Sequence, residues 1–174
     1  LHSTSRRQRQ MCIRDRCTQL ILMKEVKTVT TLMRQINVIS RCAASYRGEK
    51  FKDLKLCAAH HSYIINICKK PGISQEELVR HICVDKSNVA RQVFNLENLG
   101  YIKRIQSQKD KRVIEIYPTS KALEILPYVK EVVKFWNEYV TQDLSDEELK
   151  LLMKMMDKLV NRAKGYFENQ EVNK

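Results

Sequence analysis

Two helix start signals stand eleven residues apart between residues 73 and 100, and they constrain the fold more than any other feature. Ser74 and Glu77 form a capping box, in which the serine hydroxyl and the glutamate carboxylate each accept a hydrogen bond from the other residue's amide. Asp85 is placed to cap a second helix, and Gly100 stands where a helix of that length would end. We therefore expect two short helices joined by a turn of about three residues, which is helix-turn-helix spacing.

The second of these helices separates apolar side chains from hydrogen-bond donors. Its apolar face follows steps of four and three and consists of Val89, Val93, Leu96 and Leu99. Its exposed face carries no acidic residue and consists of Lys86, Ser87, Asn88, Arg91, Gln92 and Asn95. Arg, Asn and Gln can form paired hydrogen bonds with base edges in the DNA major groove. An ordinary solvated polar face is the alternative that this helix alone leaves open.

Two short β-prone runs follow, at residues 101–106 and 113–117. The tip between them is polar and basic and consists of Ser107, Gln108, Lys109, Asp110, Lys111 and Arg112. A hairpin directly after a helix-turn-helix is a wing, and an arginine at its tip suits the minor groove electrostatically. Because residues 85–112 carry a net charge of +4, we expect a continuous basic surface on the second helix and the wing.

The composition agrees with a DNA-binding helical protein. A net charge of +12 favours a polyanionic partner, nucleic acid before a membrane surface. Four glycines and three prolines among 174 residues indicate long helices and disfavour an all-β sandwich or barrel. No run reaches the roughly 18 apolar residues of a membrane span, so we expect a cytoplasmic protein without a membrane partner.

No sequence pattern supports an enzyme. The chain lacks a glycine-rich phosphate-binding motif, and we find no Ser/His/Asp, paired-carboxylate or zinc-hydrolase pattern. We therefore expect no catalytic residue, no cofactor and no bound metal.

Residues 1–22 are expected to be foreign to the native protein. Residues 6–16 read RRQRQMCIRDR and match, codon by codon, one reading frame of a transposase sequencing adaptor. The alternative is a native basic arm that grips a DNA groove. Met23 is then the expected native start, and the net charge without residues 1–16 is still +8.

Helical patterns flank the central region on both sides. Residues 24–46 and 57–69 each follow helical periodicity. After the wing, Thr119 is placed to cap a long helix, and Ser145 with Glu148 forms a second capping box for a final helix.

This order divides the chain into a winged helix-turn-helix region at residues 56–118 and a helical dimerisation region at residues 23–47 and 119–168. In a two-fold dimer, the two recognition helices would lie about one DNA turn apart, or ~34 Å.

The order of elements and several motifs resemble the MarR family of bacterial transcriptional regulators. The motifs lie between residues 56 and 160 and are PGISQEEL (71–78), VDKSNVAR (84–91), LENLGYI (96–102), DKR (110–112), YPT (117–119) and LSDEE (144–148). The resemblance implies a mainly α-helical fold with a small β-hairpin wing and a helical dimerisation layer. It also implies a homodimer, most often a repressor, that binds palindromic double-stranded operator DNA. The chain departs from a common family form at Lys121, where glycine is frequent.

The resemblance also implies roles for single residues. Arg112 would enter the minor groove, and Asp110 would orient it; a plain polar turn is the alternative. The residues expected at the major groove are Ser87, Asn88, Arg91 and Gln92, with Asn95 on the same face. Phosphate contacts are expected from Gln75 and Lys86, and Lys109 and Lys111 complete the expected DNA-binding set.

What the protein senses is open at this stage. Members of the resembled family often lose DNA affinity on binding small, frequently phenolic effectors between the dimer layer and the winged domain. The candidate effector-binding residues are Tyr46, His60, His61 and Tyr63, for which packing or dimer contact is the alternative.

The cysteines offer two other ways of sensing. A peroxide-sensitive thiol at Cys42 and a soft-metal corner of Cys57, His60 and His61 would each make a regulator of the same fold. The simplest interpretation of the cysteines after residue 22 is buried free thiols in a reducing cytosol. A winged-helix module that binds protein is the remaining alternative.

Overall fold

The computed structural model describes residues 26–108 and 110–171. The suspected adaptor and Lys109 lie outside the described residues. The chain divides into two compact units between residues 46 and 47, and each unit is described by itself. Helix α2 (Val26–Lys50) crosses that division and ends four residues beyond the expected 24–46. None of the described helices has the length and apolar character that crossing a membrane requires.

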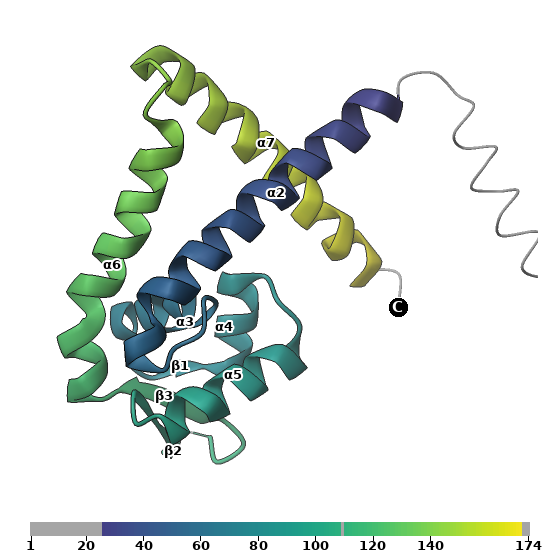
Figure 1. Ribbon diagram of the computed structural model, residues 1–174. Helices are drawn as coiled ribbons and strands as arrows, with labels where there is room; N and C mark the ends of the chain where they lie inside the picture. The colour runs from purple at the N-terminus through teal and green to yellow at the C-terminus, as the bar shows by residue number, and fades with distance from the viewer. Residues whose placement is uncertain (1–25, 109, 172–174) are drawn as a thin grey trace, which may run out of the picture. The chain divides into compact units, whose positions relative to one another are not determined.

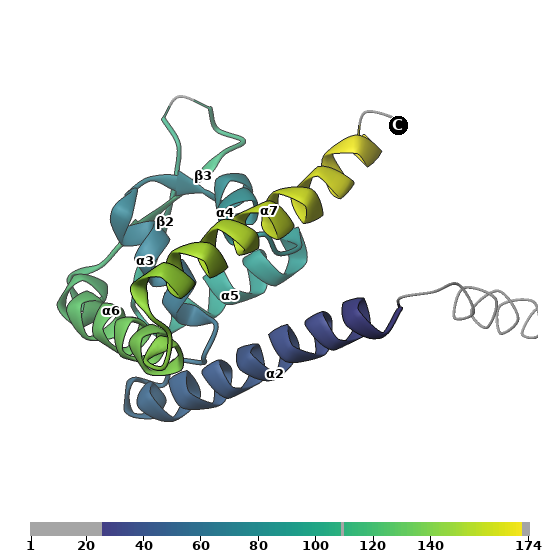
Figure 2. The ribbon, with the colours of Figure 1, turned by 90° about the horizontal axis from the view of Figure 1, so that it is seen from above.

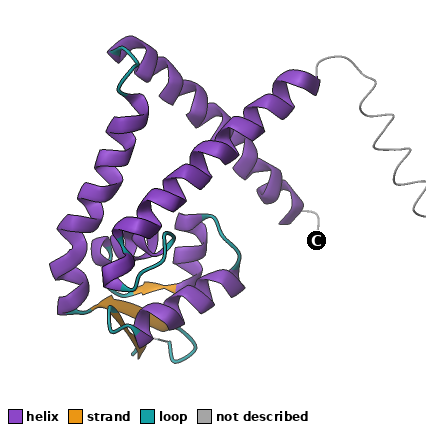
Figure 3. Cartoon of the chain, viewed as in Figure 1, coloured by secondary structure: helices purple, strands orange, loops and turns teal. Residues whose placement is uncertain are grey.

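The unit after residue 46 holds most of the predicted elements (Figures 1 and 3). A short 3-10 helix, η1 (Lys52–Leu54), precedes the helices α3 (His60–Lys69), α4 (Gln75–Ile82), α5 (Lys86–Asn98), α6 (Ser120–Thr141) and α7 (Asp146–Glu171). The strands are β1 (Ile73–Ser74), β2 (Ile102–Gln106) and β3 (Ile114–Pro118). The mainly α-helical fold class with a β-hairpin wing is confirmed.

The sheet has one strand more than the sequence indicates. Its order is β1-β3-β2 and all its pairs are antiparallel. Ile73 lies opposite Ile116, and Gly72, at a φ of +85°, donates its amide to the Ile116 carbonyl at 2.9 Å. A two-residue strand is too short to show alternation, which explains why its pattern was not visible. Figure 2 shows the loop between β2 and β3 projecting from the sheet.

The core lies between α3, α4, α5 and the sheet. Side chains with no exposed surface come from each of these elements and include Ile64, Ile67, Ile73, Leu78, Val89, Val93, Leu96 and Ile116. The predicted apolar face of α5 is thus confirmed, although Leu99 at its end is only half-buried. Since burying a side chain of this size stabilises a fold by about 1.5–3 kcal/mol, this core positions α5 firmly.

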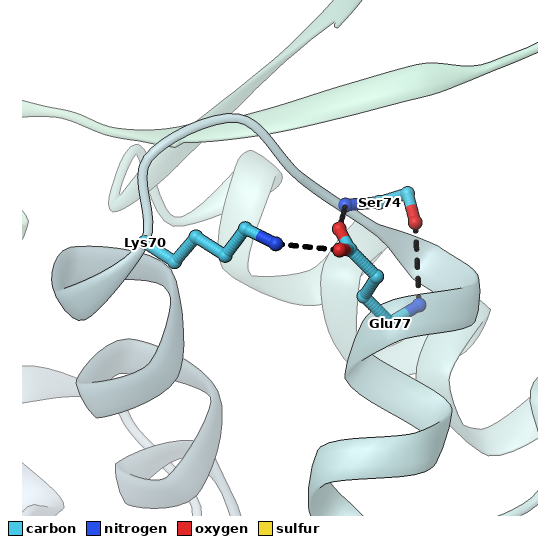
Figure 4. A network of polar contacts seen from close by, with 3 residues as sticks. All are labelled: Lys70, Ser74 and Glu77. Carbon is cyan, nitrogen blue, oxygen red and sulfur yellow. Dashed lines mark hydrogen bonds and ion pairs between the residues drawn. The ribbon is translucent and has the colours of Figure 1, made fainter.

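The two predicted helix caps of the helix-turn-helix are present. Ser74 Oγ accepts from the Glu77 amide at 3.2 Å, and the Ser74 amide donates to Glu77 Oε2 at 3.1 Å (Figure 4). Lys70 Nζ donates to the other carboxylate oxygen at 2.5 Å. Asp85 Oδ1 accepts from the Asn88 amide at 2.8 Å, and Gly100 follows α5 with a φ of +76°. Both helices of the helix-turn-helix therefore begin at a capped residue.

The C-terminal helices confirm one cap and correct another. Ser145 Oγ accepts from the Glu148 amide at 3.3 Å, and the Ser145 amide donates to Glu148 Oε2 at 2.9 Å. Thr119 precedes α6 as expected, but its hydroxyl makes no cap hydrogen bond. The hydroxyl instead donates to the Gly100 carbonyl at 2.8 Å, because the end of α5 lies beside it. Thr119 therefore joins α6 to the winged region.

Candidate nucleic-acid interface

The outward face of α5 presents a mixed set of exposed side chains. Ser87, Arg91 and Asn95 are exposed there. Because a helix turns about 100° per residue, the line through Ser87 and Arg91 continues to Phe94 and Asn98. This line lies opposite the buried Val89 and Leu96, so it is the part of α5 that a flat partner would meet first.

Phe94 is the residue of this face that sequence reasoning missed. Its side chain is 52% exposed, and it stands three residues after Arg91 on the same line. The exposed face was identified by its polar side chains, so an apolar member was left out. The i, i+3 spacing from Arg91 was the signal that could have found it. An apolar side chain in the major groove can contact the thymine methyl group.

Gln92 lies on the flank of α5 rather than on the outward line. Its side chain is half-buried. Its Oε1 is 3.0 Å from His60 Nε2 and accepts from Cys57 Sγ at 3.8 Å. Asn88 is also half-buried, and its backbone amide donates to the capping carboxylate of Asp85. The structure thus places only part of the expected major-groove set on the outward face.

The expected phosphate-contacting residues lie at the starts of α4 and α5. Gln75 is the first residue of α4 and is half-buried. Lys86 is the first residue of α5, and its ammonium group lies 3.7 Å from Glu76 Oε1. Both side chains of this pair are about three-quarters exposed. Since such surface pairs contribute only about 0–1 kcal/mol, Lys86 can exchange this partner for a phosphate.

In the wing tip, residues 110–113 form a turn. Asp110 Oδ1 accepts from the Arg112 backbone amide at 2.9 Å, and the Asp110 carbonyl accepts from the Val113 amide at 2.9 Å. Gln106 Nε2 donates to the Lys111 carbonyl at 2.7 Å. Lys111 and Arg112 have exposed side chains. Asp110 therefore shapes the main chain that carries Arg112.

One cation of the predicted basic surface has a different role. Arg104 on β2 forms a two-point contact with Glu97 on α5: its Nε donates to Oε2 at 2.8 Å, and its Nη2 forms an ion pair with the same carboxylate. The Arg104 amide donates to Glu97 Oε1 at 3.2 Å. Hydrogen bonding to Arg104 lowers the pKa of the Glu97 carboxyl. Arg104 thus connects the wing to α5 instead of facing a partner.

The four candidate effector-binding residues have different surroundings. His60 and Tyr63 are only 3% and 2% exposed and belong to the core. His61 Nδ1 donates to the Ala58 carbonyl at 2.7 Å. Burial lowers the pKa of both histidines, which favours their neutral forms. Tyr46 belongs to the other compact unit.

The proposed soft-metal corner has no free imidazole nitrogen at His60. Its Nδ1 accepts from the Cys57 amide at 3.1 Å, and its Nε2 is engaged by Gln92. Within residues 26–108 and 110–171, no group of three or more metal-ligating side chains is found. Cys42, Cys57, Cys68 and Cys83 are free thiols. The expectation that they are buried is wrong for Cys42, Cys57 and Cys83, which are exposed.

Comparisons with known proteins match this architecture. The MarR family pattern matches residues 57–114. The HTH-type transcriptional regulator BilQ of Clostridioides difficile is 32% identical over 109 residues, which are 63% of this chain and 74% of BilQ. The solved structure of the transcriptional regulator SlyA is 31% identical with a TM-score of 0.73, covering 82% of this chain and 99% of SlyA.

A third similar structure contains DNA. It is a MarR family transcriptional regulator of Listeria monocytogenes complexed with a 26mer DNA. It is 27% identical to this chain with a TM-score of 0.72, and the match covers 80% of this chain and 89% of the Listeria chain.

Proposed function

The chain belongs to the MarR family of DNA-binding transcriptional regulators, and from this premise we propose that it represses transcription as a homodimer on palindromic operator DNA. Because the family consists of transcription regulators rather than enzymes, the expectation that this chain is not an enzyme is confirmed. We propose that it acts in the cytoplasm and that a small-molecule effector releases it from DNA.

The proposal rests on one observation: one face of α5 packs in the core, while the opposite, outward face is exposed. Val89, Val93 and Leu96 are fully buried, and the start of the helix is capped by Asp85. Ser87 and Arg91 face outward, and hydroxyl and guanidinium groups can hydrogen-bond base edges. The turn that carries Arg112 supplies a second, separate contact, suited to a minor groove.

The homodimer is supported by the exposed apolar side chains of α6 and α7. On α7 the half-exposed residues include Leu151, Leu152, Met153, Met155, Leu159 and Val160. On α6 they include Leu123, Phe135, Tyr139 and Val140. A stripe of this size on two consecutive helices marks a protein interface. A second copy of the chain is the occupant that would also place two α5 helices on a palindrome.

The test begins with a selection from a pool of randomised DNA duplexes by the full chain. We expect a palindromic sequence to be enriched and its affinity to fall steeply as salt rises, because phosphate contacts release counterions. Enrichment of no sequence would contradict operator binding and would favour the protein-binding module.

Two variants then test separately the two parts of the proposed DNA interface, α5 and the wing. Arg91→Ala is expected to cost about 1–3 kcal/mol and to relax the preference at one base pair. Arg112→Ala is expected to weaken binding with little effect on folding. The matched control is Arg162→Ala, which removes an exposed arginine from α7. Equal operator affinity of the wild type and Arg112→Ala across a salt titration would contradict the role of the wing.

A further inference from the structure

We propose that Lys121 restricts the spacing between operator half-sites that the protein accepts, because it fastens the end of α5 to the first turn of α6. This inference rests on the proposed homodimer on palindromic DNA. It gives a role to the position at which the sequence departs from the common family form. Lys121 is a positioning residue in this scheme, since it acts on DNA only through α5.

The end of α5 is held by hydrogen-bond donors from the start of α6. The last carbonyl groups of a helix have no partner within the helix. Lys121 Nζ donates to the Leu99 carbonyl at 2.7 Å. Thr119 Oγ1 donates to the Gly100 carbonyl at 2.8 Å, and the Thr119 amide donates to the Tyr101 carbonyl at 3.0 Å. Three consecutive carbonyl groups at the end of α5 are therefore satisfied by Thr119 and Lys121.

The ammonium group of Lys121 has a second partner at the same place. It lies 4.3 Å from the centroid of the Tyr101 ring, which is within the range of a cation–π attraction. Tyr101 is 1% exposed, and its hydroxyl donates to the Leu54 carbonyl at 2.9 Å, so the core fixes the position of the ring. A cation at a helix C-terminus also interacts favourably with the helix dipole. The side chain of Lys121 is exposed, yet its charged end contacts two groups at the end of α5.

This contact links the two helices on which the proposed operator binding depends. The body of α6 packs against α3 and β3, and Val129 and Val132 are its buried residues there. The exposed apolar side chains of α6 are part of the surface assigned above to a second copy of the chain. Lys121 therefore connects the helix that carries the proposed dimer interface directly to the helix that meets DNA.

The link affects half-site spacing through the geometry of B-DNA. In a two-fold dimer, the distance between the recognition helices must match the DNA repeat of about 34 Å per turn. One inserted base pair moves the second half-site by about 3.4 Å and rotates it by about 34–36° around the DNA axis. To follow this shift, α5 must tilt relative to α6. The contact between Lys121 and Leu99 opposes that tilt.

Three substitutions at Lys121 test the contact. Lys121→Met keeps an unbranched side chain but removes the donor and the charge. Lys121→Ala removes the side chain beyond Cβ and retains a good helix former in α6. Lys121→Arg keeps a donor and a cation that can lie on an aromatic ring. The matched control is Lys130→Met, which removes an exposed lysine elsewhere on α6.

The experiment uses the full chain and the operator that the duplex selection enriches. Affinities are measured for that operator and for versions with one base pair inserted or deleted between the half-sites, and thermal unfolding checks the fold of each variant. The wild type and Lys121→Arg should bind the altered spacings about tenfold or more weakly than the original. In Lys121→Met and Lys121→Ala this penalty should shrink by about fivefold, the combined size of a helix-terminal charge and a cation–π contact.

The ratio between spacings distinguishes this role from a merely structural one, which would lower the affinity for every spacing alike. The inference is overturned if Lys121→Met and Lys121→Ala keep the wild-type ratio, if Lys121→Arg loses it, or if Lys130→Met relaxes it equally. A wild type that binds all spacings with the same affinity would also overturn it. A wild type that enriches no palindrome would instead refute the proposed operator binding, so the two failures are distinct.

Discussion

The helix-turn-helix buries large apolar side chains that α7 leaves exposed. Leu78 in α4 and Leu96 in α5 have no exposed surface. Leu151 and Met153 in α7 are 53% and 54% exposed, although their helix is longer and begins with an equally complete capping box. The helix starts are therefore capped by hydrogen bonds in both regions. Only the helix-turn-helix also buries leucine side chains of its helices completely within the chain.

This difference distinguishes two contributions to helix stability, the capping of the first turn and the packing of an apolar face. Capping side chains satisfy orphan amides at a helix start and contribute about 1 kcal/mol each. Most helical stability in proteins comes from packing an apolar face, and the face of α7 remains largely open. The winged region is complete in one chain, whereas α7 is completed by a second copy in the proposed dimer.

The largest expected effect tests the self-contained region. Leu78→Ala opens a cavity in a fully buried site and should lower the free energy of unfolding by about 2–5 kcal/mol. Urea unfolding should show this loss at every protein concentration. Leu152→Ala is the comparison: its loss should grow where the protein is dimeric, since mass action couples dimerisation to stability. Concentration-independent losses for both variants would contradict the proposed contrast.

The next effect tests the open face of α7. Leu152→Glu places a charge on the exposed apolar stripe and should give a folded monomer by light scattering. Operator affinity should fall about 100-fold or more, because the second half-site is no longer held at high effective concentration. Asn161→Glu makes the same charge change on the polar side of α7. A dimeric Leu152→Glu protein with unchanged affinity would show that this stripe is not the interface.

A smaller effect tests the one apolar residue on the outward face of α5. If Phe94 contacts a thymine methyl group, replacing that thymine by uracil should weaken wild-type binding by about 0.8 kcal/mol, or fourfold, the value of one buried carbon. Phe94→Ala should bind the thymine and uracil duplexes equally. A wild type that does not distinguish the two duplexes at any thymine would place Phe94 outside the base-reading surface.

The sequence was sufficient for features that depend on near neighbours. The capping box of Ser74 and Glu77 links residues three apart, and the cap by Asp85 does the same. The buried face of α5 follows a helical period, so its position was visible before any tertiary contact. These features gave the fold class and the location of the recognition helix.

Contacts between distant elements could not be read in this way. Gln92 meets His60 from 32 positions away, which turns an expected base-reading side chain toward the core. Arg104 pairs with Glu97 on another element, which removes one cation from the predicted basic surface. In both cases the side chain forms the type of polar contact expected of it. Its partner, however, depends on how α5 packs against α3 and β2.

The smallest effect compares two ion pairs, one at the start of α4 and one in α6. Hydrogen bonds from Lys70 and from the Ser74 amide lower the pKa of the Glu77 carboxyl. A carboxyl whose folded pKa is lowered stabilises the fold above its ordinary pKa of about 4.3 and loses that contribution as the pH falls below it. Glu77→Gln keeps an oxygen for the Ser74 amide but loses the charge that faces Lys70.

Glu77→Gln should therefore cost a few tenths of a kcal/mol near pH 7, and the cost should shrink as the pH falls below about 4.3 and vanish once the folded wild-type carboxyl is also protonated. Glu138→Gln in α6 breaks a pair with Lys134 whose side chains are 64% and 75% exposed. It should cost less, because no capped backbone group depends on it. Equal costs of the two substitutions at pH 7, measured by thermal unfolding, would show that the cap adds nothing to the Lys70–Glu77 pair.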